Sequence, residues 1–203
     1  MVHRLAPPDR ARCLTRCYTH RRASPDQCRF QAWEVALRFN AAALTISDQG
    51  FRGEREDLSG PLLAQLLTEL GAQVVARRIL PDEPEMITNT LSTLADGGEI
   101  DLIITTGGTG AAPRDHTPEA TAAAIERPMP GLAELLRWKG YESTPRAVLS
   151  RGIAGLRGRC LIINLAGSRG AVRDGMEILA PVLAHALQMA QGSDLEHREP
   201  SSD

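Results

Sequence analysis

The sequence predicts an α/β protein with three layers, α/β/α, built around a mostly parallel, Rossmann-like sheet. From residue 39 onwards, short apolar runs typical of buried strands alternate with longer stretches of helical periodicity. Glycine and proline stand at most of the changes between them. Because parallel strands need crossover helices, and such helices cover both faces, this alternation indicates a sheet between two helical layers.

Three strands and two helices are expected in the first part of this region. The strands are expected over residues 42–47, 73–80 and 101–106, and the helices over 59–70 and 84–94. The strand segments are rich in aliphatic and β-branched side chains, which favour strands. Ser59 is expected to cap the first helix, with a proline in its first turn and Gly71 after its end. Pro84 opens the second helix, which two glycines close.

The second part is expected to contain helices over 117–126, 132–138 and 171–189 and an apolar strand over 161–165. Thr117 is expected to cap the first of these helices, because Pro118 follows it. Residues 147–150 and 156–159 flank Gly152 and Gly155, which is consistent with a hairpin.

We expect the chain to have three parts: a basic, cysteine-containing and disordered N-terminal extension over residues 1–38, a domain over 39–192 and a polar tail over 193–203. The extension has eight arginines and three acids, whereas the remainder has fifteen basic and twenty-two acidic residues, a net charge of −7. An acidic main body argues against nucleic-acid binding. No run is long and apolar enough for a membrane span, and no secretory signal is present, so we expect a cytoplasmic protein with no membrane partner.

The cysteines do not indicate a metal site. The side chains of the extension that could bind a metal are Cys13, Cys17, Cys28, His3 and His20. Their spacing fits no standard zinc arrangement. Cys160 begins an apolar strand and is expected to be a buried free thiol.

Polar residues follow four of the predicted strands. Ser47 and Asp48 follow the first, Asp82 the second, the TTGGTG segment (105–110) the third, and the segment 164–168 the last. In a parallel sheet these ends share one edge, where ligands usually bind. The sequence therefore predicts a binding site at the carboxyl edge of the sheet.

The glycine-rich segment has the composition of a phosphate-binding loop. Its glycines allow backbone N–H groups to point into one concavity, and its threonines add hydroxyl groups. It is not a P-loop, because the lysine of that motif is missing and Lys139 is the only lysine in the chain. Phosphate charge must then be offset by arginine, helix N-termini or a metal ion, and Asp82 and Asp115 are the carboxylates that could hold Mg²⁺.

Structural roles would explain some of the same residues. A glycine after a strand often only forms a tight turn, Asp82 could cap the helix that starts near Pro84, and Asp115 could form an Asx-turn before Thr117. A lone histidine such as His116 is more often structural than catalytic. Such roles can explain each acid, glycine or hydroxyl group singly. They explain less well why all of them occur together at one edge of the predicted sheet.

The combination of motifs resembles the MogA/MoaB family of molybdenum cofactor biosynthesis proteins. The resemblance rests on TTGGTG-x₃-RD-x-TPEAT, preceded by PDE and followed by PGL, LSRG-x-AG-x-RG and INLAGS, and covers about residues 39–192. It implies the molybdenum cofactor biosynthesis fold. It also implies molybdopterin adenylyltransferase activity, in which the terminal phosphate of molybdopterin attacks the α-phosphorus of ATP and releases pyrophosphate.

The resemblance also implies a set of site residues and partners. The two functional aspartates of the family match Asp82 and Asp115, which are expected to organise Mg²⁺ and phosphate. Residues expected to bind molybdopterin or ATP are Ser47, Asp48, Ser59, Thr106, Gly107, Gly108, Thr109, Gly110, Arg114, Asn164, Gly167 and Ser168. A homotrimer and a MoeA-type metal-insertion enzyme as partner are implied by analogy.

The sequence departs from the family pattern at three positions. Ala166 and Arg169 stand where many relatives have proline, and His116 replaces a common valine. None of these changes removes a proposed catalytic acid. The alternatives are a non-catalytic MoaB-like paralogue that binds pterin or a partner, and an unrelated dinucleotide-binding oxidoreductase. The oxidoreductase is disfavoured because no GxGxxG follows the first strand.

Overall fold

The computed structural model describes residues 38–192 of the 203-residue chain. Its strands are β1 (Phe39–Ile46), β2 (Ala72–Leu80), β3 (Leu102–Thr106), β4 (Arg127–Pro128), β5 (Ala154–Arg157) and β6 (Cys160–Leu165). Its helices are α3 (Asp48–Phe51), α4 (Ser59–Glu69), α5 (Pro84–Asp96), α6 (Thr117–Ala124), α7 (Pro130–Ser143) and α8 (Arg169–Ala190), with a 3₁₀ helix, η2 (Pro145–Leu149).

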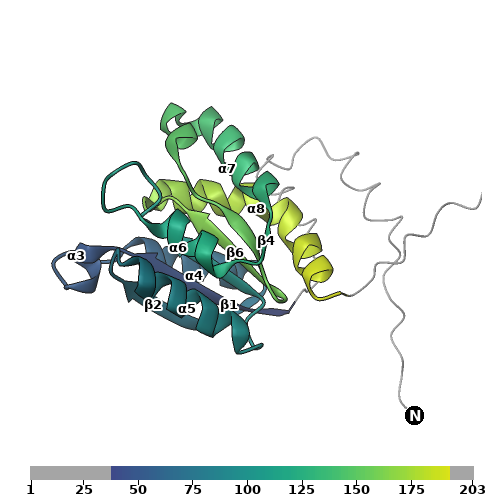
Figure 1. The fold of residues 1–203 in the computed structure, drawn as a ribbon. Helices are drawn as coiled ribbons and strands as arrows, with labels where there is room; N and C mark the ends of the chain where they lie inside the picture. Colours follow the sequence, from purple (N-terminus) through teal and green to yellow (C-terminus); the bar gives the residue numbers. More distant parts are fainter. Residues whose placement is uncertain (1–37, 193–203) are drawn as a thin grey trace, which may run out of the picture. The chain divides into compact units, whose positions relative to one another are not determined.

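The strands form one sheet in the order β2-β1-β3-β6-β5-β4 (Figure 1). Neighbours among β2, β1, β3 and β6 pair in parallel, whereas β5 and β4 join antiparallel at one edge. The parallel pairs place the carboxyl ends of four strands at one edge, as the α/β pattern predicts. The mostly parallel sheet is thereby confirmed, with a short antiparallel addition.

Helices cover both faces of the sheet, because successive strand side chains point to opposite faces. Ala41 and Ala43 of β1 pack in the cluster formed with α4, α7 and α8. Ala42 and Leu44 pack on the other face, against α5 and α6. A fully buried leucine such as Leu44 contributes about 1.5–3 kcal/mol by leaving water, and a buried alanine contributes less. The predicted three-layer fold is confirmed.

Two helix caps differ from the predicted ones. Ser59 is the first residue of α4 and its hydroxyl donates to Asp57 Oδ1 at 3.1 Å. The same Asp57 oxygen accepts from the backbone N–H groups of Ser59 and Gly60 at 3.1 and 2.9 Å, so Asp57 caps the helix. Thr117 is likewise the first residue of α6, and its hydroxyl donates to the Gly107 carbonyl at 3.0 Å. Both predicted caps are wrong, because each hydroxyl bonds to a group outside its own first turn.

The predicted hairpin over 147–159 is also wrong. Residues Pro145–Leu149 form η2, and the hairpin lies further along, where β5 pairs with β6 across a turn at Gly158. Gly158 has φ of 55°, a conformation that favours glycine in tight turns. The remaining differences are element ends. For example, α7 extends to Ser143 although its predicted range ended at Trp138.

Cys160 is a buried free thiol, as predicted. Burial raises its pKa to about 12, so the thiol stays protonated at neutral pH. Across residues 38–192, no helix combines the length and the hydropathy that a membrane span requires. The extension and the tail, with the predictions made for them, lie outside the described residues, apart from position 38.

Candidate functional site

Three strand ends meet at Gly107. Its N–H donates to the Leu165 carbonyl at the end of β6, at 3.1 Å. A β-carbon on Gly107 would lie 2.2 Å from the Ile46 carbonyl oxygen at the end of β1. Beside it, the Thr106 hydroxyl donates to the Ala166 carbonyl at 3.0 Å. Gly107 has φ of 106°, so this close approach requires glycine.

The two predicted catalytic acids lie against the glycine loop. A β-carbon on Gly108 would be 2.7 Å from Asp82 Oδ1, and one on Gly110 would be 2.7 Å from Asp115 Oδ2. The absence of a side chain at these glycines leaves room for the two carboxylates. Asp115 Oδ2 accepts from the Ala112 N–H at 2.9 Å, which closes a turn within the loop and does not cap α6.

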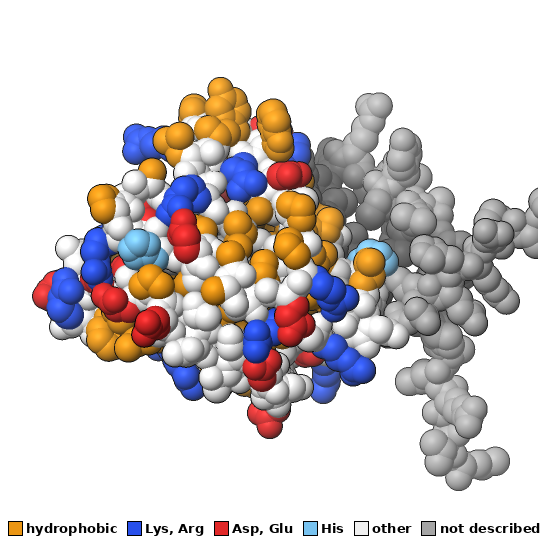
Figure 2. Space-filling model, in the orientation of Figure 1, with side chains coloured by type: hydrophobic (Ala, Val, Ile, Leu, Met, Phe, Trp, Pro, Cys, Tyr) orange, Lys and Arg blue, Asp and Glu red, His pale blue; other side chains and the backbone are white. Residues whose placement is uncertain are grey.

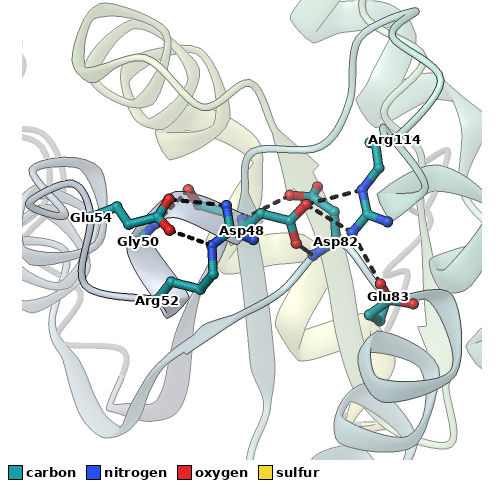
Figure 3. Close-up of polar contacts among 8 residues, drawn as sticks. Asp48, Gly50, Arg52, Glu54, Asp82, Glu83 and Arg114 are labelled. Carbon is teal, nitrogen blue, oxygen red and sulfur yellow. Dashed lines mark hydrogen bonds and ion pairs between the residues drawn. The ribbon is translucent and has the colours of Figure 1, made fainter.

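Asp82 is joined to Asp48 by two reciprocal hydrogen bonds (Figure 3). The Asp48 N–H donates to Asp82 Oδ2, and the Asp82 N–H donates to Asp48 Oδ1, both at 3.1 Å. Asp82 therefore binds the loop after β1 and does not cap α5. The Ser47 hydroxyl accepts from the Gly50 N–H at 3.1 Å and caps α3. This arrangement fixes the loop after β1 beside the loop after β2.

Arg114 extends from the glycine loop to these acids. Its guanidinium lies 2.8 Å from Asp48 Oδ2 and 3.0 Å from Glu83 Oε1 (Figure 3). In Figure 2, acidic and basic side chains lie close together at the end of the molecule where Figure 1 places α3. Arg114 is thus a cation held by carboxylates at the rim of the site, and its side chain is 58% exposed.

The surroundings of Asp82 raise the pKa of that carboxyl, whereas those of Asp48 lower its pKa. Burial raises the pKa of Asp82 above its ordinary value, and the charges of Asp48 and Asp115 raise it further. Burial acts on Asp48 in the same direction. However, the Asp82 N–H and the Arg114 guanidinium together hold the pKa of Asp48 below its ordinary value. A cation placed beside Asp82 would therefore favour its ionised form.

Asp82 and Asp115 offer carboxylate oxygens, the donor type that Mg²⁺ prefers. Within residues 38–192, no group of three or more His, Cys, Asp or Glu side chains is placed to hold a metal. Mg²⁺ typically takes one or two protein carboxylates and completes its shell with water and substrate phosphate. Asp82 and Asp115 fit that donor set.

Several predicted binding residues use their side chains within the fold. The Asn164 amide donates to Thr105 Oγ1 at 3.0 Å and to Thr121 Oγ1 at 2.9 Å, and accepts from the Ile153 N–H at 3.1 Å. Thr106, Thr109 and Ser59 are also buried. Direct contact of these side chains with a ligand remains a prediction. Their observed role is to hold the strand ends together.

A cavity of about 290 Å³ lies beside the glycine loop, between α7, η2, the end of β6 and the start of α8. Ser168 lines it and caps α8 by accepting from the Ala171 N–H at 3.1 Å. Arg137 also lines it and donates to the carbonyls of Ser150 and Gly152, at 3.4 and 2.9 Å. The segment 166–168, which follows β6, lines the cavity on one side and contacts the glycine loop on the other.

Two arginines of the site were missing from the sequence-based prediction. Arg137 anchors the wall of the cavity, and Arg151 donates to the Gly110 carbonyl at 2.7 Å. Arg151 belongs to the quoted LSRG motif, which was the available signal. Its partners lie 32–41 residues away in the sequence, so local pattern gave no indication of them.

Comparisons with known proteins agree with the geometry. Residues 42–185 match the family model described as a probable molybdopterin binding domain. The chain is 37% identical over 158 residues to the molybdopterin adenylyltransferase of Helicobacter pylori strain J99, covering 77% of this chain and 90% of that protein. It is 42% identical over 147 residues to the Drosophila melanogaster molybdenum cofactor synthesis protein cinnamon, covering 72% of this chain but only 24% of that longer protein.

A solved structure shares the fold at higher identity. The chain superposes on the crystal structure of the molybdopterin biosynthesis enzyme MoaB from Thermus thermophilus with a TM-score of 0.71 and 50% sequence identity. The match covers 76% of this chain and 97% of that chain. The matched family model spans most of the described domain, including all four strand ends of the site. The chain therefore belongs to the molybdenum cofactor biosynthesis family of probable molybdopterin binding domains.

Proposed function

We propose that the protein is a molybdopterin adenylyltransferase. The terminal phosphate of molybdopterin attacks the α-phosphorus of ATP, adenylyl-molybdopterin forms, and pyrophosphate leaves. The observation that carries the proposal is the placement of Asp82 and Asp115 against the glycine loop. The relatives named molybdopterin adenylyltransferase support it, one of them matched over 90% of its length.

Asp82 and Asp115 would hold Mg²⁺ together with the phosphates of ATP. The bound ion would neutralise phosphate charge and fix the triphosphate in place. Neither aspartate acts as a nucleophile, because the pterin phosphate supplies the attacking oxygen. The contribution of the chain is then to orient two phosphorylated substrates and to provide charge that is already in position.

Arg114 and backbone N–H groups would neutralise the remaining negative charge of the phosphates. Arg114 forms ion pairs with Asp48 and Glu83 beside Asp82, and it is exposed enough to reorient toward a phosphate. The positive φ values of Gly107 and Gly108 turn the loop sharply at the edge of the sheet. Such a turn can present N–H groups to an anion.

The cavity beside the loop suits the pterin. Its volume of about 290 Å³ is near the lower end for small-molecule sites, and both apolar and polar side chains line it. The Gly167–Ser168 turn lies between the cavity and Gly107, since a β-carbon on Gly167 would approach Gly107 Cα to 3.0 Å. We place the pterin in the cavity and the nucleotide on the acid-lined side of this turn.

The alternative is a non-catalytic, MoaB-like paralogue that binds pterin or a partner enzyme. The retained acid pair favours catalysis, because a binding protein has no need of two carboxylates beside a phosphate loop. By the family resemblance we also propose a homotrimer, a cytoplasmic location and delivery of the product to a MoeA-type metal-insertion enzyme.

The assay follows directly from the reaction. Purified protein is incubated with molybdopterin, ATP and Mg²⁺, and both pyrophosphate and adenylyl-molybdopterin are quantified. Equal amounts of the two products, dependent on Mg²⁺, are expected. Tight pterin binding with no pyrophosphate at any metal concentration would favour the non-catalytic alternative.

A further inference from the structure

We propose that Arg151 is a positioning residue that holds the Asp115 loop (residues 107–116) in the geometry needed for adenylyl transfer. This inference rests on the proposed function. Arg151 touches neither carboxylate of the acid pair in the described contacts. It acts instead on the main chain that carries Asp115 and on the helix that follows.

One guanidinium serves three acceptors from separate points along the chain. Its Nε donates to the Gly110 carbonyl at 2.7 Å, and an Nη donates to the Asp115 carbonyl. The other Nη pairs with the Glu119 carboxylate in the first turn of α6. The planar fork of arginine provides several donors at once, which lysine cannot do. Arg151 therefore joins the beginning of the loop, its end and the next helix.

The backbone of Arg151 adds a contact that side-chain substitutions leave in place. Its N–H donates to the Thr109 carbonyl at 2.9 Å. The Ala112–Asp115 turn supplies further hydrogen bonds within the loop, and Thr117 bonds to the carbonyls of Gly107 and Gly108 at its two ends. Arg114 adds only exposed ion pairs to Asp48 and Glu83. Loss of the guanidinium would therefore loosen the loop between its fixed start at Gly107 and α6 without detaching residue 151.

The segment that carries Arg151 also forms a wall of the cavity. Ser150 and Gly152 line the cavity, and their carbonyls accept from Arg137. Arg151, between them, contacts the Asp115 loop. The three consecutive residues thus connect the proposed pterin side to the proposed metal side.

The test compares Arg151→Gln, Arg151→Lys and Glu119→Gln with a matched control, Arg159→Gln, which removes an exposed arginine from the β5–β6 turn. For Arg151→Gln we expect kcat to fall about 10- to 100-fold and the Mg²⁺ concentration for half-maximal rate to rise at least about threefold. The KM for molybdopterin should stay within about twofold, because Arg137 still holds the cavity wall. Arg151→Lys should recover part of kcat, and Glu119→Gln should change it by less than about threefold.

A second readout needs no substrate. Hydrogen exchange at the amides of residues 108–117 should accelerate at least about tenfold in Arg151→Gln and remain unchanged in Arg159→Gln. Wild-type kcat and Mg²⁺ dependence in Arg151→Gln, or unchanged exchange, would overturn the positioning role. Should the wild-type protein lack adenylyl transfer, the proposed function fails while the exchange comparison still decides the role of Arg151. If Arg151→Gln does not fold, the kinetic and the hydrogen-exchange measurements are made on Arg151→Lys instead.

Discussion

Replacing Asp82 with asparagine should separate catalysis from stability. Asparagine keeps the size of the side chain and an oxygen that can accept from the Asp48 N–H, as Asp82 Oδ2 does at 3.1 Å. It removes the negative charge. Loss of one preorganised group that stabilises developing charge typically lowers kcat about 10²- to 10³-fold, or about 2.7–4 kcal/mol, and we expect a loss of this size.

The free protein should not be destabilised by the same change. In the wild type, burial raises the pKa of Asp82 and the charges of Asp48 and Asp115 raise it further, so the ionised carboxylate is unfavourable in the folded state. Stability linked to this carboxyl is fully present below pH 3.8, its ordinary pKa, and is lost as the pH rises through the folded-state value. Asp82→Asn has no ionisable group at this position, so it does not lose this stability as the pH rises. Its melting temperature should therefore equal or exceed that of the wild type at neutral pH.

The assay pairs steady-state kinetics with thermal melting from pH 4 to 8 and uses Glu134→Gln, at an exposed position of α7, as a control for charge removal. For a domain of this size, 1 kcal/mol corresponds to about 2–4 °C. The difference in melting temperature between variant and wild type should grow with pH. Activity within twofold of the wild type, or a melting temperature more than about 5 °C lower, would refute the assigned role of Asp82.

Three further substitutions test the site and its supports. Gly107→Ala should cost about 2–4 kcal/mol and most of the activity, because its φ is 106° and a β-carbon would meet the Ile46 carbonyl at 2.2 Å. Gly131→Ala in α7 is the control: an added β-carbon meets no atom within 4 Å beyond its chain neighbours and the backbone of its own helix, so chemical denaturation should show unchanged stability or a gain of up to about 1 kcal/mol. Arg114→Gln should raise the KM for ATP. The ionised Asp48 carboxylate stabilises the fold above pH 3.8, and this stability is lost as the pH falls through the lowered pKa of Asp48. Arg114→Gln should remove part of it, a small effect because the guanidinium is 58% exposed. An unchanged pH dependence of unfolding would contradict this. Asp57→Ala should cost about 0.5–2 kcal/mol by uncapping α4, and a melting temperature equal to that of the wild type would show that another group takes over the cap.

The fold was predictable because its strongest signals are local. The apolar runs that became β1, β3 and β6 are buried on both sides, and such strands have continuous aliphatic sequences. Capping was less predictable, because a hydroxyl near a helix start can bond to several partners. Ser59 and Thr117 show this, since their hydroxyl groups bond to Asp57 and to the Gly107 carbonyl. The β5–β6 hairpin was predicted at the wrong place because Gly152 and Gly155 indicated its turn, whereas the chain turns at Gly158.

The sequence by itself determined which residues stand at the carboxyl edge of the sheet, since alternation and strand ends place Asp48, Asp82 and the glycine loop there. Only the tertiary structure decided how they interact. It joined Asp48 to Asp82 by reciprocal hydrogen bonds and directed Asn164 into a buried network. It also brought Arg151 to the Asp115 loop. The physical reason is that each of these contacts spans more than 30 residues, so chain topology and packing select the partner and local preference does not.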